Sequence, residues 1–347
     1  MKNSTQPKPI VTFIMPAFKV EKHIAASIKS VRQQDFDAWE LIVVNDGSPD
    51  QSRDIALQCA AADSRIKVVD KPNGGLSDAR NFGFLQAQGR YVVFIDSDDF
   101  ITSNAISIGV ARLESEQADI AIFSYTTDHE DEAGTLIKSV PALLKDTTFT
   151  PELYKTIPDS AFANLYYAWN KLYRVDFLRS YHFNFEKGLR LIEDCEFNTR
   201  VLPKASKILF ISNVLNRYMI RNEATLSKMM HPDVFELQKR AINCKLTMFR
   251  QMKVAPLRIE KLEARFYIGC IRYVMYCLLR HARNQSFLSK VKYLYPILRN
   301  EIPSAIFRHV EAEGMKDKLI LNLIRAKSAV GLIAVYKLST ILEASES

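Results

Sequence analysis

The sequence predicts an α/β protein with a Rossmann-like, mostly parallel sheet flanked by helices and a helical extension at the C-terminus. In the first hundred residues, short β-branched apolar runs alternate with amphipathic segments of about 10–15 residues. Polar and acidic residues directly follow several of these runs. From Val234 onward the pattern is helical almost throughout.

Each expected strand is short, apolar and closed by turn residues. The expected strands are Ile10–Met15, Glu40–Val44, Ile66–Asp70, Tyr91–Ile95 and Asp119–Thr126. The segments between them carry apolar residues at helical spacing: Glu21–Gln34, Gln51–Ala62, Leu76–Gln88 and Asn104–Gln117. Strands that alternate with helices in this way form parallel sheets with right-handed crossovers.

The later elements follow a less regular pattern. Between Asp128 and Pro158 we expect an acidic turn, Asp128–Glu132, together with a hairpin, and further along the chain a helix over Arg190–Val201. Prolines at 256, 296 and 303 should break the helices that follow. The change in pattern near residue 230 predicts two domains, 1–230 and 231–347.

The composition is that of an ordinary globular protein, with 48% hydrophobic and 25% charged residues. Five scattered cysteines without CxxC spacing argue against a disulfide framework or a zinc site. The segment before Pro9 has no signal-peptide character, and the apolar stretches Phe266–Leu279 and Ala329–Leu342 fall short of the roughly 20 residues that span a bilayer. We therefore expect a cytoplasmic protein.

Charge is distributed unevenly along the chain. The net charge is +8, but the residues from Lys239 onward carry 20 Lys and Arg against 8 Asp and Glu. The tail is therefore basic and the body slightly acidic. Such a tail suits an anionic surface, either lipid headgroups on the inner face of the plasma membrane or nucleic acid.

Three expected strands end in polar or acidic residues: Asp46, Asn73-Gly74-Gly75, and Asp96 with Asp98 and Asp99. In open parallel sheets, ligands bind at the carboxyl ends of the strands. Asp96-Ser97-Asp98 places two carboxylates at i and i+2, and such hard oxygen ligands select Mn²⁺ or Mg²⁺. The alternative is an acidic turn that caps the next helix.

Two further segments carry candidate site residues. The glycine turn opens the helix that contains Asp78 and Arg80, with Ser77 as a plausible N-cap, and a helix N-terminus with a guanidinium favours a diphosphate. Its spacing is neither GxGxxG nor that of a P-loop. Glu193-Asp194 lies among apolar residues, where burial raises a carboxyl pKa toward that of a general base. A helix N-terminal pair favoured by the macrodipole is an equal alternative.

Together these segments resemble the family-2 inverting glycosyltransferases with the GT-A fold, of the bacterial cell-surface polysaccharide type. The matching segments are Phe13–Glu21, Val43–Asp50, Gly75–Gly83, Phe94–Asp99, Trp169–Tyr173 and Glu193–Phe197. The first domain would then bind the nucleotide sugar, and the second would associate with a membrane surface or oligomerise.

The resemblance implies roles for individual residues. The donor side would comprise Pro16, Phe18, Glu21, Asp46, Asp78, Arg80, Asp96, Ser97, Arg221, Thr225 and Ser227. Asp98 and Asp96 would bind the metal, Asp194 would be the general base beside Glu193, and Trp169 would meet the acceptor. The chain has Phe18-Lys19 where the family usually has Tyr-Asn, so Lys19 could instead meet a phosphate.

The resulting hypothesis is metal-assisted, inverting transfer of a hexose or N-acetylhexosamine from a UDP-sugar to a glycan acceptor, free or lipid-linked, in capsule, lipopolysaccharide or related synthesis. One alternative is a nucleotidyltransferase acting on sugar phosphates, but Pro16–Glu21 lacks the expected glycine-rich loop. Another is a basic nucleic-acid-binding protein, which leaves the acidic strand ends unexplained and matches no known binding motif. We expect no nucleic-acid partner. For the tail, membrane association and homo-oligomerisation stay open.

Overall fold

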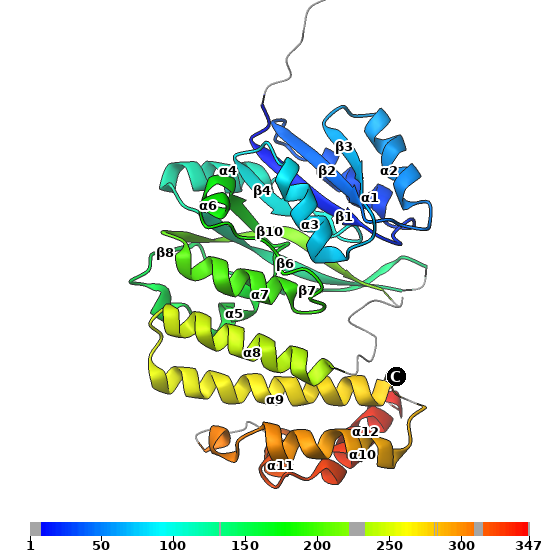
Figure 1. The fold of residues 1–347 in the computed structure, drawn as a ribbon, viewed down its shortest axis with the longest axis vertical. Helices are drawn as coiled ribbons and strands as arrows, with labels where there is room; N and C mark the ends of the chain where they lie inside the picture. The colour runs from blue at the N-terminus through cyan, green and yellow to red at the C-terminus, as the bar shows by residue number, and fades with distance from the viewer. Residues whose placement is uncertain are drawn as a thin grey trace, which may run out of the picture. The chain divides into compact units, whose positions relative to one another are not determined.

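The computed structural model describes residues 8–131, 133–221, 233–280, 282, 284–308 and 315–345. The chain divides into two compact units, residues 1–223 and 224–347. The boundary predicted near residue 230 lies outside the described residues. The first unit contains a ten-stranded sheet with helices around it, and the second is helical (Figure 1).

The strands of the first unit are β1 (Val11–Ala17), β2 (Trp39–Asn45), β3 (Ile66–Asp70), β4 (Tyr91–Phe94), β5 (Phe100–Ile101), β6 (Ile120–Glu130), β7 (Leu136–Ala142), β8 (Thr147–Phe149), β9 (Lys171–Arg174) and β10 (Ile208–Ile220). Its helices are α1 (Ile24–Arg32), α2 (Ser52–Ala61), α3 (Leu76–Gln86), α4 (Ala105–Glu116), α5 (Phe162–Tyr166), α6 (Val175–Ser180) and α7 (Glu193–Val201). The five strands and the helices expected in the first 126 residues are all present, and most ends shift by only a few residues.

The sheet has the order β3-β2-β1-β4-β9-β6-β10-β5, with β7 paired to β6 and β8 to β10. Strands β3, β2, β1 and β4 are mutually parallel. Strand β9 runs antiparallel to both of its neighbours, so the second half of the sheet is mixed. The predicted α/β class is confirmed, and the parallel part brings the loops that follow β1 to β4 to one edge.

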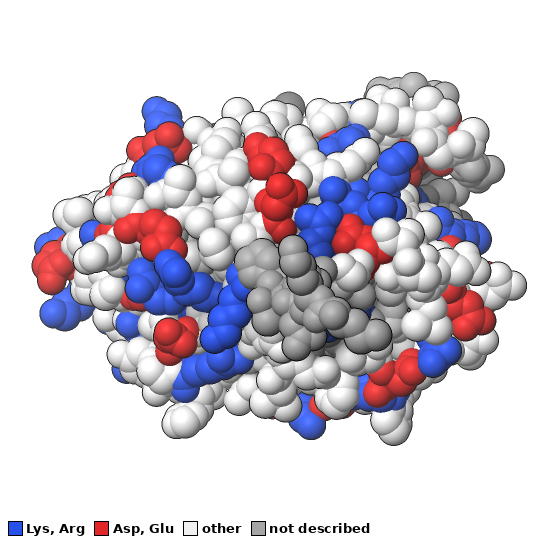
Figure 2. Space-filling view, turned by 90° about the horizontal axis from the view of Figure 1, so that it is seen from above, with Lys and Arg blue, Asp and Glu red and all other residues white. Residues whose placement is uncertain are grey.

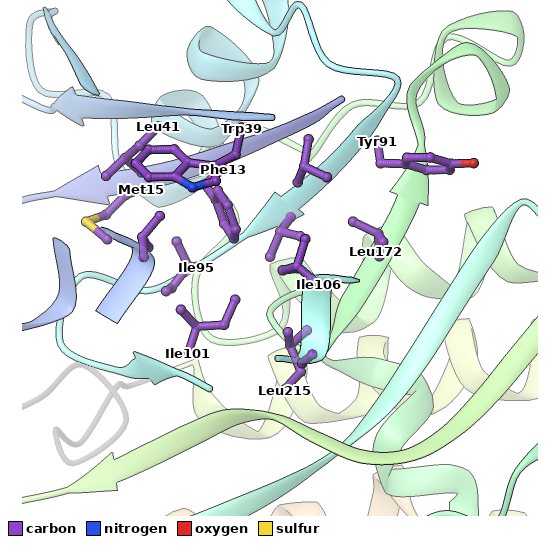
Figure 3. Close-up of a cluster of buried hydrophobic side chains, with 14 of the residues drawn as sticks. Phe13, Met15, Trp39, Leu41, Tyr91, Ile95, Ile101, Ile106, Leu172 and Leu215 are labelled. Atoms are coloured by element: carbon purple, nitrogen blue, oxygen red, sulfur yellow. The ribbon is translucent and has the colours of Figure 1, made fainter. Parts of the chain in front are cut away.

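Burial on both faces explains why β1 and β2 read as continuous apolar runs, since every residue of both strands is buried. On one face, Phe13 and Met15 pack into a core with α1 and α4 side chains, part of which is drawn in Figure 3. On the other face, α3 approaches so closely that a Cβ on Gly83 would lie 2.6 Å from Ile14 Cγ2. Only glycine permits this contact, which sets α3 against the sheet.

Two local predictions are wrong. The N-cap of α3 is Gly75, at φ 84°, whereas Ser77 lies buried inside the helix. The acidic turn predicted to begin at Asp128 is displaced, because Asp128–Glu130 continue β6 and the turn closes between Asp131 and Gly134. The expected hairpin is present, since β7 pairs antiparallel with β6. Asp128 is buried there, bonded to Ser139 and Arg217, and this neutralisation allows an acidic residue inside a strand.

The second unit is built from α8 (Val234–Gln251), α9 (Pro256–Arg280), α10 (Phe287–Pro296), α11 (Met315–Arg325) and α12 (Ala329–Ser345). Pro256 opens α9, in agreement with the predicted break there. Pro296 does not end the helical backbone, because a π-helical turn, Ile297–Glu301, continues directly from α10. Among the described residues, no helix combines the length and the apolar character that crossing a membrane requires.

Figure 2 shows one face of the molecule on which Lys and Arg lie beside Asp and Glu, so opposite charges offset each other locally.

Candidate active site

The loop after β1 presents an exposed aromatic ring. Pro16 is buried within β1, whereas the Phe18 side chain is 43% exposed. Lys19 adopts a left-handed conformation at φ 57°, and its N–H donates to Ser48 Oγ at 2.7 Å. Glu21 Oε2 accepts from the backbone N–H of Gln51 at 2.9 Å. The loop is thereby tied to the one after β2, beside a recess of about 330 Å³ lined in part by Lys19 and Glu21.

Asp46, at the end of β2, organises the glycine turn that opens α3. Its Oδ1 accepts from Lys71 Nζ at 2.6 Å and from Gly74 N–H at 2.9 Å, and its Oδ2 accepts from Gly75 N–H at 2.8 Å. A carboxylate has about four acceptor positions, so one on Oδ2 stays available to a ligand. The contact of Asp46 with a nucleobase stays a prediction, and the structure adds a role for this residue in holding the glycine turn.

Asp78 shares the lysine that holds Asp46. Its Oδ2 lies 2.7 Å from Lys71 Nζ, and its Oδ1 lies 2.5 Å from Lys187 Nζ. Hydrogen bonds from Lys187 and then Lys71 lower the pKa of Asp78. Sequence reasoning missed Lys71, although its position directly after β3, at the edge that carries Asp46, could have identified it.

The acidic residues after β4 form one cluster, in which Asp99 is buried and Asp96 and Asp98 are partly exposed. Arg80 Nη2 donates to Asp96 Oδ1 at 2.9 Å, and burial raises the pKa of Asp96 to about 6 against the effect of this guanidinium. Asp99 is 1% exposed; its Oδ1 accepts from Met219 N–H, and its Oδ2 has no hydrogen-bond partner among the residues that the structure describes. Burial raises the pKa of Asp99 well above the ordinary value, and Asp98 and Asp96 add to that rise.

This donor set fits a divalent cation that takes part of its coordination from elsewhere. Among the described residues, no group of three or more His, Cys, Asp and Glu could hold a metal ion on its own. Asp96 and Asp98 nevertheless offer hard carboxylate oxygens, and their negative charges act on the neighbouring Asp99, whose pKa they help to raise. Mg²⁺ is characteristically held by one or two carboxylates together with substrate phosphates and water.

Arg80 links this cluster to the acidic pair at the start of α7. The guanidinium is 1% exposed, donates to Asp194 Oδ1 and lies 3.7 Å from Glu193 Oε1. It also lies 5.1 Å from the centre of the Phe185 ring. The predicted contact of Arg80 with a diphosphate stays a prediction, since the described contacts of its Nη atoms are with carboxylates.

Asp194 and Glu193 occupy different environments. Asp194 Oδ2 accepts from the backbone N–H of Ala168 at 2.8 Å, so each carboxylate oxygen has a donor. Burial, followed by the charge of Asp194, raises the pKa of Glu193 to about 7. Both residues also stand in the first turn of α7, as the alternative based on the helix dipole expects.

Trp169 belongs to an aromatic cluster. Its ring stacks on Tyr167, at a centroid distance of 4.7 Å, and on Tyr218, at 5.6 Å, and makes a T-shaped contact with Tyr125. The side chain is 5% exposed. The predicted acceptor platform is therefore packed against tyrosines. Sequence reasoning did not identify Tyr125 and Tyr218 because they lie on β6 and β10, whereas Tyr167 is only two residues away in the chain.

Arg221, at the end of β10, bonds to Glu130 Oε2 at 2.7 Å and to the backbone oxygen of Asp98 at 2.7 Å. It thereby fixes the loop that carries the acidic cluster. Thr225 and Ser227, predicted to complete this group, lie outside the described residues.

Comparisons with known proteins agree with this architecture. The sequence model of the family "Glycosyl transferase family 2" matches residues 12–184. The uncharacterized glycosyltransferase EpsJ of Bacillus subtilis is 32% identical over 212 residues, which cover 60% of this chain and 61% of EpsJ. Glycosyltransferase GlyA of Streptococcus pneumoniae is 30% identical over 239 residues, 66% of this chain and 34% of GlyA. The chain thus spans about three fifths of the first relative and one third of the second.

Among solved structures, residues 1–349 of S. aureus TarS in complex with UDP-GlcNAc have a similar fold, with a TM-score of 0.63 and 21% identity. The alignment covers 94% of this chain and 90% of that one. The fold likeness, the family match and the acidic strand ends agree with one another. The chain belongs to glycosyl transferase family 2 and has the GT-A fold.

Proposed function

We propose that this chain transfers a hexose or N-acetylhexosamine, with inversion, from a UDP-sugar to a glycan acceptor in cell-surface polysaccharide synthesis. The observation that carries the proposal is the Arg80 guanidinium, which contacts both Asp96 at the nucleotide edge and Asp194 on α7. One buried cation thus joins the carboxylate expected beside the donor to the carboxylate expected to activate the acceptor.

The strand ends would bind the donor. Phe18 would stack on the base, the open acceptor position of Asp46 would take its N3–H, and Pro16 and Glu21 would shape the contacts to base and ribose. TarS, whose fold is similar, is the protein solved with UDP-GlcNAc and with UDP, which supports a UDP-sugar. Asp98 and Asp96 would hold Mn²⁺ or Mg²⁺, which would supply positive charge to the leaving diphosphate.

Asp194 would act as the general base. The acceptor hydroxyl attacks C1 of the sugar from the face opposite to UDP, its proton passes to Asp194, and the bond between C1 and the UDP oxygen breaks. Both Asp194 oxygens have free lone pairs beside their bonds to Arg80 and Ala168, so the carboxylate can accept this proton while it is held in place.

The second unit would bring the enzyme to a lipid-linked acceptor at an anionic membrane surface, which places the protein on the inner face of the plasma membrane. Support comes from the basic charge of that region and from exposed apolar side chains on α10 to α12. These are Phe287, Leu288, Tyr295, Met315, Leu319, Val330 and Leu338. Salt-sensitive co-sedimentation with anionic liposomes is the expected result; its absence would favour oligomerisation as the role of this unit.

The test of the function is UDP release from a panel of UDP-sugars in the presence of Mn²⁺, with glycan acceptors added. Wild-type protein should release UDP from at least one donor, and the new anomeric centre should be inverted by NMR. Asp194→Asn should abolish transfer with an unchanged fold. Wild-type turnover by this variant would remove Asp194 from the mechanism, and no release from any donor would refute the assignment.

A further inference from the structure

Lys171, the first residue of β9, is fully buried and has no role in the mechanism so far. Its Nζ donates to the backbone oxygen of Asn164 at 2.8 Å, to Asn170 Oδ1 at 2.8 Å and to the backbone oxygen of Tyr167. Three acceptors around one nitrogen match the three N–H groups of an ammonium. A neutral amine would point its lone pair at one of these oxygens, so the geometry selects the charged form.

The Tyr167–Ala168 peptide lies between this ammonium and the proposed base. Its carbonyl oxygen accepts from Lys171, and its N–H donates to Asp194 Oδ2 at 2.8 Å. In a trans peptide, the C=O and N–H bonds point in opposite directions. The peptide dipole, about 3.5 D, is therefore aligned with its negative end at the lysine and its positive end at the carboxylate.

The surrounding contacts hold the loop in this orientation. Asn170 Nδ2 donates to the backbone oxygens of Phe123 and Asn164, and Phe123 N–H donates to the backbone oxygen of Asn170 at 3.0 Å. Asn198 Nδ2 donates to the backbone oxygen of Asp194 at 2.9 Å and to that of Tyr166. Burial lowers the pKa of Lys171 well below its ordinary value, whereas the charge of Asp194 and the three oxygens around Nζ favour the ammonium.

We propose that Lys171 is a positioning residue: its ammonium fixes the Tyr167–Ala168 peptide so that the Ala168 N–H holds Asp194 at the angle that proton acceptance requires. This inference rests on the proposed function. Arg80 alone would leave the carboxylate free to turn about its single contact at Oδ1. A second donor on Oδ2 fixes the carboxylate plane, which sets the direction of the lone pairs that remain.

The test compares Lys171→Met with Tyr154→Phe in the full chain. Methionine fills the volume and removes the donors, and Tyr154→Phe likewise removes one buried bond to a backbone carbonyl, that of Ala205. A misplacement of about 1 Å can cost about a hundredfold in rate. We expect Lys171→Met to lower kcat about tenfold to a hundredfold with the KM for the donor unchanged, and Tyr154→Phe to keep both.

A second readout needs no substrate. With ¹⁵N-alanine labelling, the Ala168 amide of the wild type should be protected from hydrogen exchange and shifted downfield, because it bonds to a carboxylate. The Asp194→Asn variant shows where this resonance lies when the acceptor carries no charge. Lys171→Met should move this resonance toward that of Asp194→Asn. Lys171→Gln, which keeps a donor but no charge, is measured in the same way if methionine prevents folding.

An unchanged Ala168 amide, or a moved amide with an unchanged kcat, overturns the proposal. Parallel changes in kcat and KM, equal to those of Tyr154→Phe, would show a structural role only and overturn it as well. If the wild-type protein releases UDP from no donor, the proposed function is refuted. The Ala168 amide resonance needs no substrate, so it still tests whether Lys171 positions the Tyr167–Ala168 peptide.

Discussion

Replacing Arg80 by methionine should destabilise the first unit strongly, because it leaves three carboxylates without their shared cation. The side chains of Asp96, Asp194 and Glu193 are 26%, 16% and 13% exposed, so water can solvate each of them only in part. Breaking a buried ion pair by removing one partner costs about 3–5 kcal/mol. The matched control is Arg53→Met, whose pair with Asp70 at 2.8 Å is exposed and screened by solvent, so that its loss should change stability little.

The assay is urea unfolding followed by tryptophan fluorescence. The chain has two tryptophans, Trp39 and Trp169, and both lie in the first unit, so the signal reports on that unit alone. Asp194→Asn, added to Arg80→Met, should restore part of the lost stability, because one repelling charge is removed. We expect a coupling energy of about 0.5–3 kcal/mol. Additive effects, or equal losses for Arg80→Met and Arg53→Met, would refute the argument that Arg80 neutralises the cluster.

Two further predictions concern stability. The pKa of Glu193 is raised from its ordinary value of 4.5 to about 7, so the folded state binds this proton more tightly than the unfolded chain. The stability that the protonated Glu193 contributes is therefore present below about pH 4.5 and is lost as the pH rises through about 7. Glu193→Gln should become more stable relative to the wild type over that window. A difference in Tm between the two proteins that does not change with pH would contradict this. Gly83→Ala places a Cβ 2.6 Å from Ile14 Cγ2 and should cost about 1–3 kcal/mol, whereas Gln86→Ala on the exposed side of α3 should change stability by about 0.5 kcal/mol or less. Equal midpoints for these two variants would show that α3 can move away from β1.

Local pattern was sufficient to predict the first half of the sheet and the edge that carries the candidate site. Strands β1 to β4 are short, apolar and closed by polar residues, and parallel order then places Asp46, Asp96 and Asp98 along one edge. The sequence also singled out Arg80 and Asp194. Their direct contact could not be read from it, because the two residues are 114 positions apart and no periodicity encodes such a pairing.

Other errors have the same physical origin. An acidic residue normally indicates a turn, but Asp128 lies inside β6 because Arg217, 89 residues later, neutralises it. The direction of β9 and the burial of Trp169 likewise depend on partners from distant segments. Lys171 was missed because a single lysine has no pattern of its own, and its role is set by the oxygens that surround it. Lys71 was missed although it directly follows β3 at the edge that carries Asp46.

The central claim is that the acidic edge of the sheet binds a cation together with the diphosphate of a UDP-sugar. Calorimetric titration of UDP into the full chain, with Mn²⁺ and with chelator, tests this claim directly. We predict that Mn²⁺ strengthens UDP binding and that Asp98→Ala loses this strengthening while keeping its folded tryptophan fluorescence. Equal binding of UDP with and without Mn²⁺, or no binding in either condition, would contradict the account.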